Sequence, residues 1–201
     1  MEPKRKGFEG SSGNPEPTLD PETQVIIYRP QATGPAAREV KLDSRIDVRE
    51  AAEEYLRYQL LMPESGFLSG VFPREQGMMV EFVPYYQGIP VYSGYVRVDV
   101  SARGIEEVRQ FWVRPAGYKE MQPKAVRPAA EALLRLAGHL ERTGQRTRTI
   151  VEVRLGYYSG PSLTVPVAEG ISAWDTVPVW RITLDNGLVY YINAFNLELE
   201  S

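Results

Sequence analysis

The chain has 201 residues, of which 43% are hydrophobic and 24% charged, a composition typical of folded proteins that excludes wholesale disorder. Its 26 acidic and 23 basic residues give a net charge of −3 and are scattered, so no basic stripe favours nucleic acid as a partner. The absence of cysteine excludes disulfides, cysteine-ligated zinc, iron–sulfur clusters and thiol nucleophiles.

The N-terminal part of the sequence carries little periodicity. Residues 1–23 are rich in Gly, Ser, Pro and Glu, which predicts a flexible tail or linker. Residues 24–46 then predict one strand, at 24–29, followed by a loop. No stretch of the chain approaches the roughly 18 to 20 apolar residues that a membrane-spanning helix needs. If the native protein is anchored, we expect its anchor to lie outside this sequence.

A first helix-plus-meander unit is predicted over residues 47–118. Asp47 followed by Glu50 indicates a capping box and a helix that runs to about Met62. The apolar positions that share one face of this helix are Val48, Ala51, Tyr55, Tyr58 and Met62. Three antiparallel strands follow, at 78–87, 90–101 and 105–114. The middle strand alternates valines with polar residues, which predicts one buried and one solvated face.

A second unit of the same kind is predicted over residues 119–201. Its helix begins near Pro128, a residue tolerated in a first turn, and ends before Gly144. The apolar face of this helix is predicted to hold Val126, Ala130, Leu133, Ala137 and Leu140. Three strands follow at 149–158, 177–184 and 188–195, and the Asp-Asn-Gly run at 185–187 is a strong hairpin signal between the last two.

Together these elements predict a two-layer α+β fold in which a helix followed by three antiparallel strands (α-β-β-β) occurs twice. The halves also share a short pattern, since Val-Glu-Phe at 80–82 precedes Tyr-Tyr at 85–86, and Val-Glu-Val at 151–153 precedes Tyr-Tyr at 157–158. A spacing of about 70 residues suggests an internal duplication. Chance or shared strand propensity is the alternative explanation for so short a match.

No catalytic, cofactor or metal site is expected. His139 is the only histidine, so a two-histidine metal site cannot be assembled. Acidic neighbours such as Glu53-Glu54 and Glu106-Glu107 point to different sides of their elements, which favours a solvated face over acid–base catalysis. Neither the Rossmann nor the Walker glycine pattern occurs, so no nucleotide is implied. A carboxylate-dependent hydrolase, which needs two carboxylates roughly 5 to 10 Å apart in a cleft, is the least supported alternative.

The aromatic residues are the best candidates for a binding surface. The chain has 12 Tyr and 3 Trp, with Tyr-Tyr pairs at 85–86, 157–158 and 190–191. Adjacent tyrosines of a strand face opposite sides, so one of each pair can stay exposed for a partner, while core packing is the alternative. Long loops such as the one predicted at 160–177 are often functional, and this loop contains a tryptophan. The candidate partner or ligand surface is Tyr86, Tyr157, Tyr158 and Trp174.

Several short motifs resemble those of one family. The run at 177–182 (VPVWRI), followed by Asn-Gly at 186–187 and by YYINA at 190–194, resembles the closing motif of the YycI family. The Gly-Tyr-Tyr at 156–158, the run at 86–91 (YQGIPV), Gly94 and the VRV at 96–98 add to this resemblance. The similarity covers about residues 47–197, in the expected order and with a helix between the blocks.

The resemblance implies a non-catalytic regulator of a bacterium of the Gram-positive type, tethered to the membrane by one N-terminal helix, with its folded body extracytoplasmic. Members of the family act with a sister protein, YycH, on the WalK (YycG) sensor histidine kinase that governs cell-wall metabolism. This sequence departs from the family at its start, where a polar tail stands in the place of the spanning helix. A module of the related PepSY type that binds a peptide or cell-wall fragment is the alternative function.

Overall fold

The structure is a computed structural model that describes residues 16–31, 33–63, 66–113, 117, 124–145, 148–159 and 175–200. Trp174 and most of the predicted loop at 160–177 lie outside the described residues. In the described part of the chain, two antiparallel sheets and two α-helices form an α+β fold, which confirms the predicted fold class.

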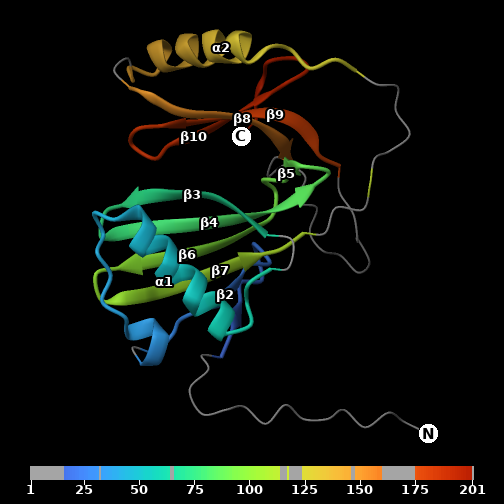
Figure 1. The fold of residues 1–201 in the computed structure, drawn as a ribbon. Coiled ribbons are helices and arrows are strands. Elements are labelled where there is room, and N and C mark those ends of the chain that lie inside the picture. The colour runs from blue at the N-terminus through green and yellow to red at the C-terminus, as the bar shows by residue number, and fades with distance from the viewer. Residues whose placement is uncertain are drawn as a thin grey trace, which may run out of the picture.

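The two sheets form separate layers, each with one α-helix packed against it (Figure 1). The larger sheet has the order β1-β2-β7-β6-β4-β3, and the short β5 pairs with β4. Its strands are β1 (Thr18–Leu19), β2 (Ile26–Tyr28), β3 (Gly66–Arg74), β4 (Gly77–Tyr86), β5 (Ile89–Pro90), β6 (Tyr95–Ser101) and β7 (Gly104–Phe111). The smaller sheet has the order β11-β10-β9-β8. Its strands are β8 (Ile150–Tyr158), β9 (Val177–Leu184), β10 (Val189–Asn193) and β11 (Leu199–Glu200).

Helix α1 (Arg45–Tyr58) covers the larger sheet and is preceded by the short 3-10 helix η1 (Gly34–Ala37). Its N-cap is Ser44, whose hydroxyl accepts a hydrogen bond from the Asp47 N–H at 3.2 Å, so the helix starts earlier than the predicted capping box. The predicted face is buried at Val48, Ala51 and Tyr55. The prediction that Tyr58 belongs to the buried face is wrong, because the helix ends at this residue and its side chain is 64% exposed.

Strand β3 is the main element that the sequence analysis missed, so the first half has a helix followed by four long strands rather than three. The glycine and proline residues in its sequence disfavour the prediction of a strand. A β-bulge also interrupts its pairing with β4 between Leu68 and Gly70. The predicted strand at 90–101 is divided into β5 and β6. Residues 18 and 19, within the predicted tail, pair with β2.

Helix α2 (Ala129–Arg142) covers the smaller sheet, where Leu136 and Leu140 pack against β9 and β10. The predicted apolar face is displaced, since Ala132 and Leu136 are buried, whereas Ala130 and Ala137 are exposed. The predicted hairpin between β9 and β10 is present, and Gly187 adopts φ +81°, a conformation that favours glycine. No helix of the described part of the chain has the length and hydrophobicity that a membrane span requires.

The inner faces of the two sheets, away from α1 and α2, pack against each other. Val83 of β4, Tyr92 and Val179 of β9 form a small apolar core between the sheets. The polar face predicted for β6 therefore points toward the second sheet rather than only to solvent, and Arg97 on that face is 32% exposed. Each sheet with its helix makes two layers, and the two pairs meet across this interface (Figure 1).

Both halves have a helix followed by an antiparallel meander, β3-β4-β6-β7 in the first and β8-β9-β10-β11 in the second. The sequence pattern that suggested a duplication pairs Glu81 of β4 with Glu152 of β8. These strands hold different positions, second and first, in their meanders. The short pattern therefore does not mark equivalent strands.

Candidate functional site

The predicted tyrosine surface lies where the two sheets meet at one end. Tyr86 is half-buried at the end of β4, where it pairs with Ile89 of β5. Tyr157 is half-buried near the end of β8, its carbonyl accepts a hydrogen bond from the Tyr92 N–H at 2.8 Å, and a parallel bridge joins it to Val91. The structure thus places Tyr86 and Tyr157 on strands that meet at β5, far apart in the sequence.

Tyr158 has a different role from the one predicted for an exposed tyrosine. Its ring stacks on Tyr191 of β10, with ring centroids 4.1 Å apart and an interplanar angle of 5°. Tyr92 also packs on Tyr191, at 5.7 Å. Burial raises the pKa of Tyr191 far above its ordinary value and that of Tyr92 to about 12. These three rings hold the sheets together.

A buried ion pair joins the sheets at the centre of their interface. Glu81 of β4 and Arg181 of β9 have side chains only 4% and 2% exposed, and Arg181 Nη2 donates to Glu81 Oε1 at 3.0 Å. Ser69 of β3 donates to the same carboxylate oxygen at 2.9 Å and accepts from Arg181 Nη1 at 2.8 Å. Charges this deeply buried are retained only where hydrogen bonds compensate for lost hydration.

Three further side chains surround this pair. Arg97 Nε donates to the second oxygen of Glu81 at 2.8 Å, and Glu152 Oε2 lies 3.7 Å from Arg181 Nη1. The Arg181 guanidinium lies 4.9 Å from the ring centroid of Tyr92. Burial is the largest single effect and disfavours the charged form of Arg181, but Glu81, Tyr191, Tyr92 and Glu152 together outweigh it and raise the pKa of Arg181. Nε of Arg181 has no hydrogen-bond partner among the described residues.

A small cleft opens beside this cluster, with a volume of about 200 Å³. Its lining comes from both sheets: Phe72, Pro73 and Arg74 of β3, Met79 and Glu81 of β4, Arg97 of β6, Arg181 of β9, Gly187 and Leu188 of the hairpin, and Val189 and Tyr191 of β10. The cleft therefore lies between the two units and is lined by charged and apolar side chains together.

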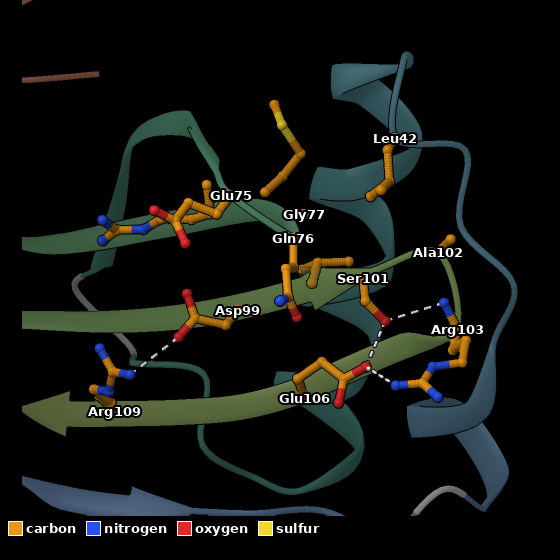
Figure 2. A pocket seen from close by; sticks show the side chains of 13 residues that line it. Leu42, Glu75, Gln76, Gly77, Asp99, Ser101, Ala102, Arg103, Glu106 and Arg109 are labelled. Carbon is orange, nitrogen blue, oxygen red and sulfur yellow. Dashed lines mark hydrogen bonds and ion pairs between the residues drawn. The ribbon is translucent and has the colours of Figure 1, made fainter. Parts of the chain in front are cut away.

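A second, wider hollow of about 840 Å³ lies at the end of the larger sheet, near the β3–β4 and β6–β7 turns (Figure 2). Its charged groups are largely matched: Arg109 pairs with Asp99 at 3.5 Å, and Arg103 pairs with Glu106 at 3.5 Å. Figure 2 shows these pairs among the side chains that line the hollow, with Ser101 donating a hydrogen bond to Glu106. Matched, solvated charges give this hollow no preference for a ligand of one sign.

Neither region contains a metal or catalytic constellation. No group of three or more His, Asp or Glu residues that could hold a metal ion occurs in the part of the chain that the structure describes. His139 lies on α2, beside the Tyr190 ring at 5.8 Å between centroids. Glu53 and Glu106 are engaged by arginines in ordinary surface ion pairs.

Comparison of the sequence with known families gives a match to the YycI protein family over residues 42–195. The chain belongs to the YycI family. Membership indicates a regulatory role in a two-component system, in a family associated with membranes and with protein partners. The YycI family is a regulatory family that is not known for catalysis. No curated protein matches this YycI family member.

Two solved structures have a similar fold to this YycI family member. The C-terminal domain of YpeB from Bacillus megaterium is 15% identical, with a TM-score of 0.48, and the match covers 98% of this chain and 85% of that one. An uncharacterized protein from Eubacterium rectale is 12% identical, with a TM-score of 0.46, covering 88% of this chain and 67% of that one.

The sequence analysis proposed a tyrosine surface for this YycI family member but did not predict its ionic cluster. Glu81 and Arg181 belong to motifs that carried the family resemblance or the repeat, yet neither was predicted as a site residue. A signal was available, because each is a lone charge among apolar residues of a strand, at 79–83 and 177–184. Their pairing, across 100 residues, requires the packing of the sheets.

Proposed function

We propose that this domain modulates a membrane sensor histidine kinase of the WalK (YycG) type through protein–protein contacts, without catalysis. The observation that carries the proposal is the YycI family match over residues 42–195. The partners are the kinase and a YycH-like sister protein, and the process regulated is cell-wall metabolism. In this proposal the domain works at the extracytoplasmic face of the membrane, to which an N-terminal helix tethers it.

The contact surface that we propose comprises Tyr86, Tyr157 and Tyr158 at the tyrosine-rich end of the domain, and it also includes the predicted contact residue Trp174, which lies outside the described residues. Tyr86 and Tyr157 are half-buried at the junction of the sheets, so each presents ring area to solvent while its backbone is fixed by strand pairing. Rigid aromatic side chains of this kind supply contact area at low entropic cost. Tyr158, stacked on Tyr191, supports the surface from within.

Regulation through contacts requires that the domain bind one signalling state of the kinase better than the other. The junction suits this requirement because it joins two units. A change in the relative orientation of the units would alter the tyrosine surface. We propose further that the units arose by duplication of a helix followed by a four-stranded meander, which is the element order of both halves. The buried pair of Glu81 and Arg181 would then link the second strands of the two repeats.

The test is binding between the full-length protein in membranes or nanodiscs and the purified kinase with its extracellular domain. We expect association, and we expect Tyr86→Ala and Tyr157→Ala to weaken it at least tenfold, equivalent to about 1.4 kcal/mol each. The matched control is Tyr58→Ala, because Tyr58 is 64% exposed at the end of α1.

Two results would reject this function. The kinase and a YycH-like protein could both fail to bind at high micromolar concentration, which would reject the regulatory role. Alternatively, the three tyrosine variants could weaken binding equally, which would reject the surface. The PepSY-like ligand-binding alternative is favoured by one specific observation, the arginine-lined cleft between the sheets.

A further inference from the structure

We propose that the cleft between the two sheets, defined by Arg74, Arg97, Arg181 and the apolar side chains around them, is a binding site for a carboxylate group. The ligand is a short organic acid or an acidic peptide, which share this chemistry. This inference does not depend on the identity of the kinase partner.

The charges that line the cleft are unbalanced. Three arginines, Arg74, Arg97 and Arg181, face one carboxylate, Glu81. Both oxygens of Glu81 already accept hydrogen bonds, one from Arg97 and the other from Arg181 and Ser69. Glu152, outside the lining, lies 3.7 Å from Arg181 Nη1, so three arginines are set against two carboxylates and the cleft keeps one unmatched positive charge.

Hydrogen-bond donors remain available on the same arginines. Arg181 is only 2% exposed, yet its Nε has no partner among the described residues, and buried donors are rarely left without one. Arg97 uses its Nε for Glu81, and its guanidinium lies over the Tyr95 ring at 4.0 Å, so within the described part of the chain its terminal N–H groups remain for another acceptor. Arg74 donates to the sulfur of Met79, a weak acceptor that a carboxylate would replace favourably.

Size and shape favour a carboxylate over larger anions. A volume of about 200 Å³ corresponds to roughly seven water molecules at about 30 Å³ each, which suits a short acid and excludes a nucleotide. The planar guanidinium groups match the two oxygens of a carboxylate. Phe72, Leu188 and Val189 offer apolar contact to its hydrocarbon chain, while Glu81 disfavours a doubly charged phosphate.

A ligand in this cleft would contact both units at once. Arg97 belongs to β6 of the larger sheet and Arg181 to β9 of the smaller one, so a carboxylate between them bridges the sheets. Binding would stabilise the packed arrangement by the free energy of the new contacts.

The experiment is a titration of the ¹⁵N-labelled protein, followed by amide chemical shifts, with glutarate and with a short peptide rich in glutamate. Glutaramide, the neutral diamide of the same shape, is the control ligand. For an acid of this size we expect a dissociation constant of about 1 mM. The shifted amides should lie in β3, β6, β9 and the β9–β10 hairpin.

The variants separate a specific site from general attraction of anions. Arg74→Gln, at an exposed position outside the buried cluster, should weaken glutarate binding about fivefold, and Arg97→Gln at least tenfold. The control is Arg103→Gln, because Arg103 is 88% exposed in the other hollow and should leave affinity unchanged. Arg74→Gln keeps the test valid if Arg97→Gln does not fold.

Each outcome decides the proposal. Tighter binding of the peptide would assign the site to a partner segment, and tighter binding of glutarate would assign it to a free acid. The proposal is overturned if neither ligand shifts the cleft amides at about ten times the expected dissociation constant, or if glutaramide binds as well as glutarate. Equal affinity in Arg74→Gln and Arg103→Gln would overturn it too.

Discussion

Replacing Glu81 by glutamine tests whether the buried ion pair holds the two sheets together. Glu81→Gln preserves the shape of the side chain but removes its charge, so Arg181 keeps only Glu152, at 3.7 Å and 28% exposed, as a carboxylate neighbour. Removing one partner of a buried pair costs about 3–5 kcal/mol, because the other charge stays buried without compensation. Since glutamine can still accept a hydrogen bond, we expect a loss near the lower end, about 3 kcal/mol.

The assay is urea unfolding and thermal unfolding followed by circular dichroism. A loss of about 3 kcal/mol lowers Tm by roughly 6–12 °C in a protein of this size. The matched control is Glu106→Gln, whose carboxylate is 48% exposed and pairs with an arginine that is 88% exposed. This change should cost less than about 1 kcal/mol.

A double variant tests whether the loss of stability comes from an unpaired buried charge. In Glu81→Leu combined with Arg181→Met both charges are removed, so the variant should be more stable than either single variant, because neither member of the pair leaves the charge of the other buried without compensation. The reasoning is refuted if Glu81→Gln is no worse than Glu106→Gln, or if the two single losses simply add in the double variant.

Other changes give further checks. Gly156→Ala should cost about 1–3 kcal/mol because the added Cβ would meet the Tyr92 ring and lie 2.9 Å from a backbone oxygen, whereas Gly138→Ala on α2, with nothing within 4 Å, should gain about 0.5–1 kcal/mol in the same unfolding assay. A hydrogen bond from a backbone N–H and a nearby arginine lower the pKa of Asp47 below 3.8, so it stabilises the fold above pH 3.8 and loses this effect as pH falls further; Asp47→Asn should flatten the acid limb of Tm against pH. Burial raises the pKa of Tyr55 and of Tyr92 from 10.0 to about 12, so stability should fall as pH rises from 10 toward 12, and Tm measured across this range should fall with it.

Local signals in the sequence were enough to predict much of the fold. The hairpin at 185–187 and strand β9 follow from turn chemistry and alternation, and β9 has the predicted bounds. The buried positions of α1 follow from its periodicity. Strand β3 escaped because Gly66, Gly70 and Pro73 lower strand propensity, and its pairing with β4 decides its conformation instead.

The site depends on packing between distant segments, which local patterns do not encode. Tyr86 and Tyr157 were predicted one by one, but their meeting at β5 depends on the parallel bridge between Val91 and Tyr157. The stacking of Tyr158 on Tyr191 was not predicted, because Tyr191 lies in another strand. The cleft arginines were missed for the same reason, since charge on an inner strand face looks solvated until a second sheet covers it.

Because Glu81 and Arg181 are far apart in the sequence, the ribosome adds Arg181 to the chain well after Glu81. At about 5–20 residues per second, a ribosome needs roughly 5–20 s to add the 100 residues between them. During that interval Glu81 can pair with Arg97 of its own sheet, so the first half of the nascent chain can fold with this carboxylate already in an ion pair. Within the second half, the carboxylate neighbour of Arg181 is Glu152 of β8, which is 28% exposed and lies 3.7 Å away, too far for a hydrogen bond. The Arg181 guanidinium can leave water only once it docks on a finished first sheet, so the N-terminal half acts as the template on which the C-terminal half is completed.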